Sequence, residues 1–379
     1  MNKQKILSIL KNTAAIIVML AMLVIIFYQN RDRDFFKFGR DESTLISQSE
    51  GENSSQGYTQ SDVKPLGDKV CYVTTSSYSF LDEKGKGNKL SIALSEPTLH
   101  TEGEYALCYN KNSLEFTVFK RDREYYTVNV ENRIICAKVS GNGYSFVATE
   151  KEGYNCECSV YNRSGEPIFK WDISKSEFLD GDVNYDNKAI AISLASSGEE
   201  KLMGEVILID ITDAKVIEKK SFESQLFYTV DFNKNGTYTA LGSNCLVYFN
   251  ADGTPKWSYD YNSDTLYKAD VSNPDMMVVA FSQMGSGIKG NSTKVVVLNR
   301  LGKIIGERSF DGITDDISVS EDNIAFAFGR NIYVTNSALE DRKNIKSETG
   351  VKKIALFKDN EHLFVIGASQ ASIIAAERE

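Results

Sequence analysis

One short pattern returns along most of the chain: an apolar strand, an Asn or Asp, a turn that contains glycine, and a second strand. Its clearest copies are "SFLDEKGK" (79–86), "VYNRSGE" (160–166), "VYFNADGT" (247–254) and "VVLNRLGK" (296–303). Glycine supplies the positive φ that such a short hairpin connection needs. The turn glycines are Gly85, Gly165, Gly253 and Gly302. Their spacings are close to two, two and one units of about 42 residues, a period typical of β-repeat proteins.

Degenerate copies fill the gaps in this series. "TVFKRDRE" (117–124) lacks the glycine, and "LIDITDAK" (208–215) has Ala214 in its place. A second recurring element precedes each hairpin and consists of an apolar residue, a polar turn and an apolar strand. Its eight copies lie at 65–74, 100–109, 139–149, 183–193, 230–242, 271–282, 319–329 and 356–367.

Each unit therefore contains four short strands in a meander. A four-stranded sheet cannot bury both of its faces alone, but sheets packed around an axis cover one another and leave only short edges. The period and the scarcity of proline, with five residues in the whole chain, predict an all-β protein: a β-propeller of seven or eight four-stranded blades that spans 61–379. A large β-sandwich is the alternative, but it does not explain one fixed period. The last copy lacks a fourth strand, so we expect an N-terminal strand to complete that blade.

The N-terminal segment has a different character. Residues 13–28, "TAAIIVMLAMLVIIFY", contain no charge, and with the preceding apolar residues they are long enough to span a hydrocarbon core of about 30 Å. A cleaved signal peptide would end in small residues, whereas this run ends in Phe27 and Tyr28. A buried core helix is the other alternative. We predict a cytoplasmic tail over 1–12 and a single transmembrane anchor over 13–28.

By the positive-inside rule, the basic residues of the tail predict a cytoplasmic N-terminus and a propeller outside the cell. Four basic residues on the far side of the apolar run argue against this orientation. Between anchor and propeller, residues 29–60 are first charged and then rich in Ser and Gln. Such a composition cannot form a core, so the prediction is a disordered linker.

The charge of the chain restricts its partners. There are 43 basic and 52 acidic residues, of which seven basic and two acidic lie in 1–40, so the remainder carries 36 against 50 and a net charge of −14. Phosphate backbones attract basic surfaces. The sequence therefore argues against nucleic acid as a partner.

Several residues resemble catalytic or metal-binding groups, but each has a simpler interpretation. His100 and His362 lie far apart and lack the neighbours of a metal motif. Glycines at 285, 287 and 290 stand between two predicted strands rather than before a helix, so a long hairpin fits better than a phosphate loop. Asp180, Asp182, Asn184 and Asp186 alternate like the start of a calcium loop. Tyr185 replaces the glycine of that loop, so an inter-strand turn is the better interpretation.

The six cysteines all lie in strand-like sequence, at Cys71, Cys108, Cys136, Cys156, Cys158 and Cys245. We interpret them as buried small apolar residues, with a Cys71–Cys108 disulfide between successive repeats as the alternative. Trp171 and Trp257 occupy matching places shortly after turn glycines and are expected to pack neighbouring blades. No residue qualifies as catalytic, cofactor-binding or metal-binding, and no cofactor is predicted.

Three stretches carry a family resemblance: "EPTLHTEGEYALCY" (96–109), "AKVSGNGYSFVATEKEGYNCECSVYNRSGEPIFKW" (137–171) and "GEVILIDITDAKVI" (204–217). On these the chain resembles an uncharacterised family of membrane-anchored β-propellers from Clostridia-type Gram-positive bacteria, with repeats like those of quinoprotein and WD40 propellers. The resemblance implies the fold and the single membrane anchor. It implies no catalytic residue, and the turn at 110–116 is less rich in glycine than the family pattern.

Two functions are compatible with these features. The first is a membrane-tethered extracytoplasmic binding platform for a protein or a cell-wall glycan, as in propeller scaffolds of envelope assembly complexes. The second is a carbohydrate-active enzyme, a glycoside hydrolase or lyase, for which two or three carboxylates with aromatic platforms should gather at the channel mouth. The anchor, the linker and the absence of a catalytic motif favour the first.

Overall fold

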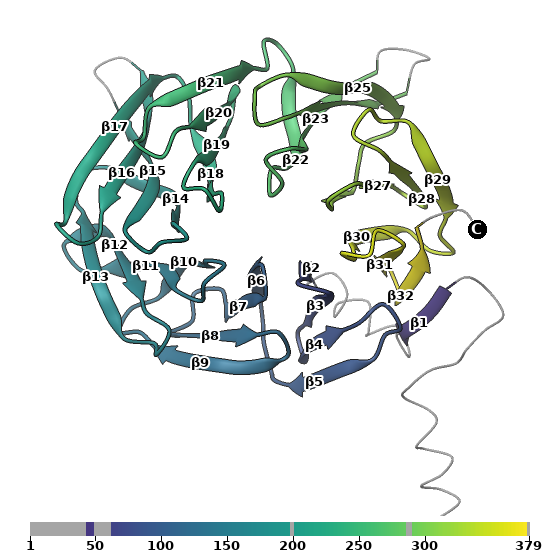
Figure 1. The fold of residues 1–379 in the computed structure, drawn as a ribbon, viewed down its shortest axis with the longest axis horizontal. Helices are drawn as coiled ribbons and strands as arrows, with labels where there is room; N and C mark the ends of the chain where they lie inside the picture. The colour runs from purple at the N-terminus through teal and green to yellow at the C-terminus, as the bar shows by residue number, and fades with distance from the viewer. Residues whose placement is uncertain (1–42, 49–61, 198–200, 286–289, 377–379) are drawn as a thin grey trace, which may run out of the picture.

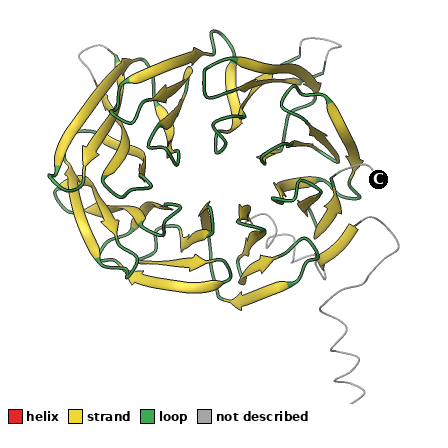
Figure 2. Cartoon of the chain, in the orientation of Figure 1, coloured by secondary structure: helices red, strands yellow, loops and turns green. Residues whose placement is uncertain are grey.

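The computed structural model describes residues 43–48, 62–197, 201–285 and 290–376. In this part of the chain every regular element is a β-strand (Figures 1 and 2). The strands form eight antiparallel four-stranded sheets, which stand as blades around a central opening (Figure 1). The predicted all-β propeller is confirmed, and the number of blades is eight rather than seven.

Each blade runs from the central channel to the circumference in strand order. The inner strands are β2 (Asp62–Leu66), β6 (Pro97–Glu102), β10 (Ile134–Val139), β14 (Glu177–Val183), β18 (Phe227–Phe232), β22 (Thr265–Asp270), β26 (Asp316–Val319) and β30 (Val351–Leu356). The second strands are β3 (Lys69–Thr74), β7 (Tyr105–Asn110), β11 (Ser145–Lys151), β15 (Ala189–Ser197), β19 (Tyr238–Gly242), β23 (Met277–Gln283), β27 (Ile324–Phe328) and β31 (His362–Gly367).

The third strands are β4 (Ser77–Leu81), β8 (Glu115–Lys120), β12 (Tyr154–Tyr161), β16 (Leu202–Asp210), β20 (Cys245–Phe249), β24 (Ser292–Leu298), β28 (Asn331–Thr335) and β32 (Gln370–Ala375). The outer strands are β5 (Gly87–Ser91), β9 (Arg123–Asn129), β13 (Pro167–Ile173), β17 (Lys215–Glu223), β21 (Pro255–Asp260), β25 (Ile304–Asp311), β29 (Asp341–Lys346) and β1 (Ser43–Gln48). Blade 1 begins with β2 and blade 8 with β30.

Blade 8 is built from both ends of the described chain. Its outer strand is β1, which pairs antiparallel with β32 from Ser43↔Ile374 to Gln48↔Gln370. This confirms that an N-terminal strand closes the ring. It also corrects the expectation that all of 29–60 is a disordered linker, because residues 43–48 satisfy their backbone groups on the otherwise open edge of β32. The other parts of 29–60 lie outside the described residues.

The turns that join third and outer strands explain the repeated glycines. Gly165, Gly253 and Gly302 have φ of 75°, 85° and 74°, a region that side chains with a Cβ rarely adopt. In the degenerate copies Arg121 and Ala214 keep this left-handed backbone, with φ of 59° and 52°. The turn geometry is therefore conserved through the fold even where the glycine is not present.

Each of these glycines also lies close to the preceding blade. A Cβ on Gly302 would stand 2.8 Å from the ring of Trp257, on the outer strand of blade 5. The Trp257 indole donates a hydrogen bond to the Arg300 carbonyl (3.1 Å) and stacks on Tyr248, with ring centroids 5.3 Å apart. The prediction that Trp257 packs neighbouring blades is thus confirmed. Trp171 stacks on Phe169 and packs against the apolar cluster between blades 3 and 4.

The hydrophobic core is divided into eight clusters, one at each junction between successive blades. Between blades 1 and 2, for example, Phe80 and Cys71 pack against Cys108 and Phe119. Second and third strands such as β4, β19 and β20 are buried along their whole length because both of their faces are covered by neighbours. This is the physical reason for the repeat: each blade buries its faces only against the next.

No helix among the described residues is long and apolar enough to cross a membrane. The predicted anchor over 13–28 and the tail over 1–12 lie outside the described residues, so both remain predictions.

Candidate functional site

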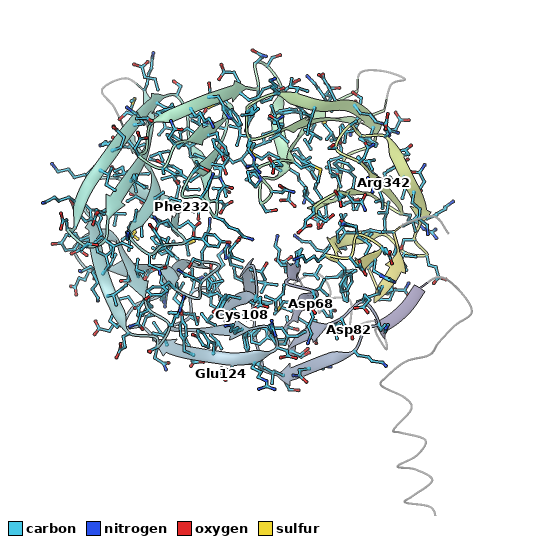
Figure 3. The ribbon with its side chains drawn as sticks, in the orientation of Figure 1. Asp68, Asp82, Cys108, Glu124, Phe232 and Arg342 are labelled. Carbon is cyan, nitrogen blue, oxygen red and sulfur yellow. The ribbon has the colours of Figure 1, made fainter. Side chains whose placement is uncertain are left out.

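The central channel is where the eight inner strands bring their polar side chains together. Phe232 lies at the inner end of its blade, whereas Glu124 lies at the circumference (Figure 3). The inner strands, each four to seven residues long, place ten charged side chains and one histidine around the axis. They are Asp62, Lys64, His100, Lys138, Asp180, Asp182, Asp231, Lys268, Asp270, Asp316 and Lys353.

Lys138 of β10 is the centre of a buried ion cluster that joins three blades. Its Nζ lies 2.6 Å from Oδ2 of Asp180 and 2.8 Å from Oδ1 of Asp231, and it donates a third hydrogen bond to the Val230 carbonyl (3.0 Å). Three donors are thus fully used. Burial lowers the pKa of Lys138, but the carboxylates of Asp180 and Asp231 outweigh burial and raise the pKa well above its ordinary value. The ammonium stays charged and is not available as a base.

A second set of side chains connects each inner strand to the backbone of the next blade. Between blades 4 and 5, Asp180 accepts the Val230 N–H and Asp182 accepts the Phe232 N–H, both at 2.8 Å. The same kind of bond recurs at other junctions: Asp270 accepts from Val319, Asp316 from Ile354, and Ser318 from Leu356. We call these side-chain-to-backbone bonds the clasps. They satisfy inner-strand N–H groups that have no further strand to pair with.

His100 makes the equivalent bond between blades 2 and 3. Its Nδ1 accepts the Val139 N–H at 3.2 Å, which requires the neutral imidazole. Burial, reinforced by the positive charge of Lys138, lowers the pKa of His100 to about 3. His100 is therefore a neutral structural acceptor rather than a general acid or base at physiological pH.

The other half of the channel is less tightly paired. Lys353 Nζ lies 3.6 Å from Asp62 and 3.9 Å from Asp316, and Lys268 lies 3.8 Å from the same Asp316 carboxylate. These distances exceed a hydrogen bond. Lys64 is exposed to the solvent of the channel. The carboxylate of Asp62, followed by carboxylates across the channel, raises its pKa, although desolvation by the surrounding channel walls acts in the opposite direction. The ion pairs of the channel are thus close and buried at blades 3 to 5, and more distant at blades 6 to 8 and 1.

The residues that resembled a calcium loop are separated by the fold. Asp180 and Asp182 form clasps, Asn184 caps its own turn by accepting the Lys188 and Ala189 N–H groups, and Asp186 is exposed. The inter-strand-turn interpretation is confirmed. Among the described residues no group of three or more His, Cys, Asp or Glu side chains is placed to hold a metal ion.

The two histidines lie on different blades with separate partners. His362 Nδ1 is 2.6 Å from Oδ2 of Asp359, in an open depression of about 610 Å³ where blades 8 and 1 meet. Charged groups of both signs line that depression: Asp68, Glu83, Lys84, Lys358, Asp359 and Glu361. Gly285 and Gly290 flank the connection between β23 and β24, which confirms a hairpin rather than a phosphate loop.

All six cysteines are free thiols, and five of them are fully buried. Cys71 and Cys108 pack in one cluster between blades 1 and 2 without a disulfide, so the pairing considered from the sequence is not formed. Burial raises the pKa of Cys108, Cys136 and Cys158 well above the ordinary value. These thiols are apolar filling, as expected from the sequence.

Sequence reasoning missed the ion cluster and the clasps. The residues of the cluster come from positions 138, 180 and 231, so no local spacing brings them together. One signal was nevertheless present: when the repeats are aligned on their polar turns, Asp182, Asp231 and Asp270 fall at the same place, one residue before the apolar residue that leads the turn.

An eight-bladed β-propeller with a closed ring and a charged channel is the class defined by this fold. A family of unknown function (DUF5711) matches residues 41–375, and the chain belongs to this family. No curated protein matches the chain.

Solved structures share the fold at low sequence identity. The crystal structure of BamB from Moraxella catarrhalis is similar with a TM-score of 0.53 at 12% identity, over 88% of this chain and 99% of that chain. The β-propeller domain of Cps50 (Swd1) from Myceliophteria thermophila has a TM-score of 0.48 at 10% identity, over 89% of this chain and 100% of that chain.

Proposed function

We propose that this chain is a membrane-tethered, extracytoplasmic propeller that acts as a non-catalytic platform for a protein or cell-envelope partner. Membrane attachment rests on the uncharged run at 13–28 and the basic residues around it. The origin in Clostridia-type bacteria likewise rests on the family resemblance of the sequence.

The observation that carries the non-catalytic assignment is the state of the channel carboxylates. Asp180 and Asp182 accept backbone N–H groups of blade 5, Asp231 pairs with Lys138, and Asp270 and Asp316 accept backbone N–H groups of the next blade. A general acid or nucleophile has to face its substrate with a free oxygen. Carboxylates used to join blades supply rigidity, which suits a surface that recognises partners in one fixed shape.

The alternative is a carbohydrate-active enzyme. Two exposed tyrosines on inner strands, Tyr228 and Tyr267, are the feature that favours this alternative, because a sugar ring can stack on such side chains. Incubation of the protein with isolated cell-wall glycan should release no new reducing ends above the level of a heat-denatured sample. Release that is abolished by Asp270→Asn would establish the enzyme instead.

The platform function is tested by affinity purification from native membranes. The full-length chain carries a C-terminal tag, and co-purifying proteins are quantified against a tagged, unrelated single-span protein extracted in the same detergent. We expect at least one protein, or isolated wall glycan in a parallel binding assay, to be enriched. The absence of any specific protein together with no glycan binding would refute the proposal.

Location is tested separately in intact cells. Protease added outside should digest the propeller, which follows the predicted anchor, while a cytoplasmic marker remains intact. Protection of the propeller until the membrane is lysed would reverse the proposed orientation.

A further inference from the structure

Five inner strands share the same irregularity near their first residues. In β10, β14, β18, β22 and β30 the register with the second strand skips one residue, which leaves that residue unpaired in a β-bulge. The unpaired residues are Ile135, Leu179, Tyr228, Tyr267 and Lys352. Four of them are apolar or aromatic and belong to four successive blades, 3 to 6.

These four large apolar or aromatic side chains are fully or partly exposed, unlike most side chains of this kind in the second and third strands. Ile135 is 40% exposed, Tyr228 52% and Tyr267 49%, and Leu179 is partly exposed. Most large apolar side chains of the second and third strands are instead buried between blades. We call Ile135, Leu179, Tyr228 and Tyr267 the bulge crescent. It lies on the inner strands at the end where the chain enters them from the preceding blade.

The crescent includes the junction at which the ring is least closely packed. Successive inner strands pack against each other around the channel, but β18 and β22 do so least (Figure 1). This junction also has no clasp among the described residues. Asp231 stands at the same place in its repeat as Asp182 and Asp270, which bind the next blade. Its carboxylate instead pairs with Lys138, and among the described residues no clasp joins it to β22.

A polar atom beside this junction has no partner. Tyr261, in the connection from β21 to β22, is 1% exposed, and its hydroxyl forms no hydrogen bond with the described residues. Burial, with smaller effects from Cys245, Tyr259 and Tyr228, raises its pKa. A buried hydroxyl without a partner costs free energy, and a ligand group seated between blades 5 and 6 would relieve that cost.

The charge of the channel indicates the sign of the occupant. The inner strands carry eight acidic residues and five lysines, namely Asp62, Glu102, Glu177, Asp180, Asp182, Asp231, Asp270 and Asp316 against Lys64, Lys138, Lys268, Lys352 and Lys353. His100 is neutral, and Lys138 is already neutralised by two carboxylates. The channel next to the crescent therefore attracts a cation.

We propose that the bulge crescent binds an extended segment of a partner polypeptide, in which an aromatic or branched apolar side chain packs on Tyr228 and Tyr267 and an adjacent lysine or arginine enters the channel. This inference rests on the proposed platform function and names the site and the chemistry of its partner. Ile135 and Leu179 offer no hydrogen bonds to sugar hydroxyls, which favours a polypeptide over a glycan. A second copy of this chain is disfavoured because both copies carry net negative charge.

The test uses the full-length protein and synthetic probes. A fluorescein-labelled 12-residue peptide of alternating Lys and Trp or Leu is titrated by fluorescence anisotropy. Matched peptides have Glu in place of Lys, or Ser in place of Trp and Leu, and chito-oligosaccharide serves as the glycan probe. The crescent variant is Tyr228→Ser with Tyr267→Ser. The control variant is Tyr154→Ser with Leu301→Ser, whose side chains are 44% and 59% exposed away from the inner strands.

We expect the basic-apolar peptide to bind the wild type, to bind the crescent variant at least tenfold more weakly, and to bind the control variant within twofold of wild type. Both variants should keep the wild-type unfolding midpoint because they change exposed side chains. Equal binding of the acidic-apolar peptide, or undiminished binding by the crescent variant, would overturn the inference. Chito-oligosaccharide binding that depends on the crescent would overturn it in favour of a glycan site.

The membrane purification separates this inference from the platform function. If the wild type and the crescent variant recover the same partner equally, the platform function stands and the crescent is not its site. If the wild type recovers no partner, the platform function fails, while the peptide titration still decides whether the crescent binds basic-apolar polypeptide.

Discussion

Replacement of Lys138 by methionine gives the sharpest test of how the channel stabilises the ring. The side chains of Lys138 and Asp180 are 10% and 8% exposed, and that of Asp231 is 30% exposed. Lys138→Met keeps the aliphatic volume but leaves Asp180 buried beside no cation. Removal of one partner of a buried ion pair costs about 3–5 kcal/mol. Since Asp231 is partly hydrated and Asp180 keeps its bond from Val230, we expect one such penalty rather than two.

The free energy of unfolding is measured by urea denaturation of the purified full-length chain at pH 7. Lys268→Met is the matched control, because it removes an inner-strand lysine whose nearest carboxylate oxygen is 3.8 Å away. Its expected loss is below about 1 kcal/mol. The triple variant with Lys138→Met, Asp180→Asn and Asp231→Asn should regain at least half of the loss, because neutral amides carry no stranded charge.

The pH dependence has a definite sign. Burial raises the pKa of Asp231, but the charge and hydrogen bond of Lys138 outweigh it and hold the pKa below its ordinary value. In the wild type this carboxylate therefore stabilises the fold above its unfolded pKa, and the contribution is lost as pH falls through the folded pKa. Without Lys138 both carboxylates protonate more easily, so the deficit of Lys138→Met should shrink from pH 7 to pH 4. A deficit below about 1 kcal/mol, or one that grows on acidification, would refute the assignment of Lys138 as the charge that holds three blades together.

Three further predictions follow from the same structure. The pKa of His100 is about 3, whereas the unfolded imidazole titrates near 6.5. The free energy of unfolding should therefore fall as pH drops below about 6.5, by up to about 1.4 kcal/mol per pH unit. In urea titrations His100→Gln should lack this slope, and the control His362→Gln should keep it. Deletion of residues 1–48 should lower the unfolding midpoint far more than deletion of 1–40, because β1 supplies the outer strand of blade 8, at about 1 kcal/mol per lost ladder hydrogen bond; equal midpoints in calorimetry would contradict closure by β1. Gly302→Ala should destabilise by about 1–2 kcal/mol through its positive φ and the contact with Trp257, whereas Gly290→Ala, which meets no atom within 4 Å, should leave urea unfolding unchanged.

The architecture was predictable from the sequence because it repeats. Each Asn or Asp followed by a left-handed residue marks one hairpin, and the apolar strands between hairpins report that both faces are covered. The blade count was uncertain because the fourth strand of the eighth blade is β1, whose short sequence STLISQ gives only a weak strand signal and is stabilised by pairing with β32.

The channel was less predictable because it is assembled from single residues of many repeats. Lys138 and Asp231 meet across two blades, and no local pattern in either stretch indicates the other. The bulges at Tyr228 and Tyr267 were not predictable, because the register in which β18 and β22 pair with their second strands decides which residue is left unpaired. The common position of Asp182 and Asp270 was visible in the repeat, but its use as an acceptor for the next blade became clear only from the ring.

The pairing of β1 with β32 also sets the order of events during synthesis. Gln48 leaves the ribosome early, and its partner Gln370 is made only after seven blades have been translated. The edge of blade 8 cannot be completed before that, so the growing chain has to keep β1 from pairing with the other exposed edges for most of its translation. Because β1 is mostly polar, it should pair only weakly with the exposed apolar edges of the other blades before β32 is made.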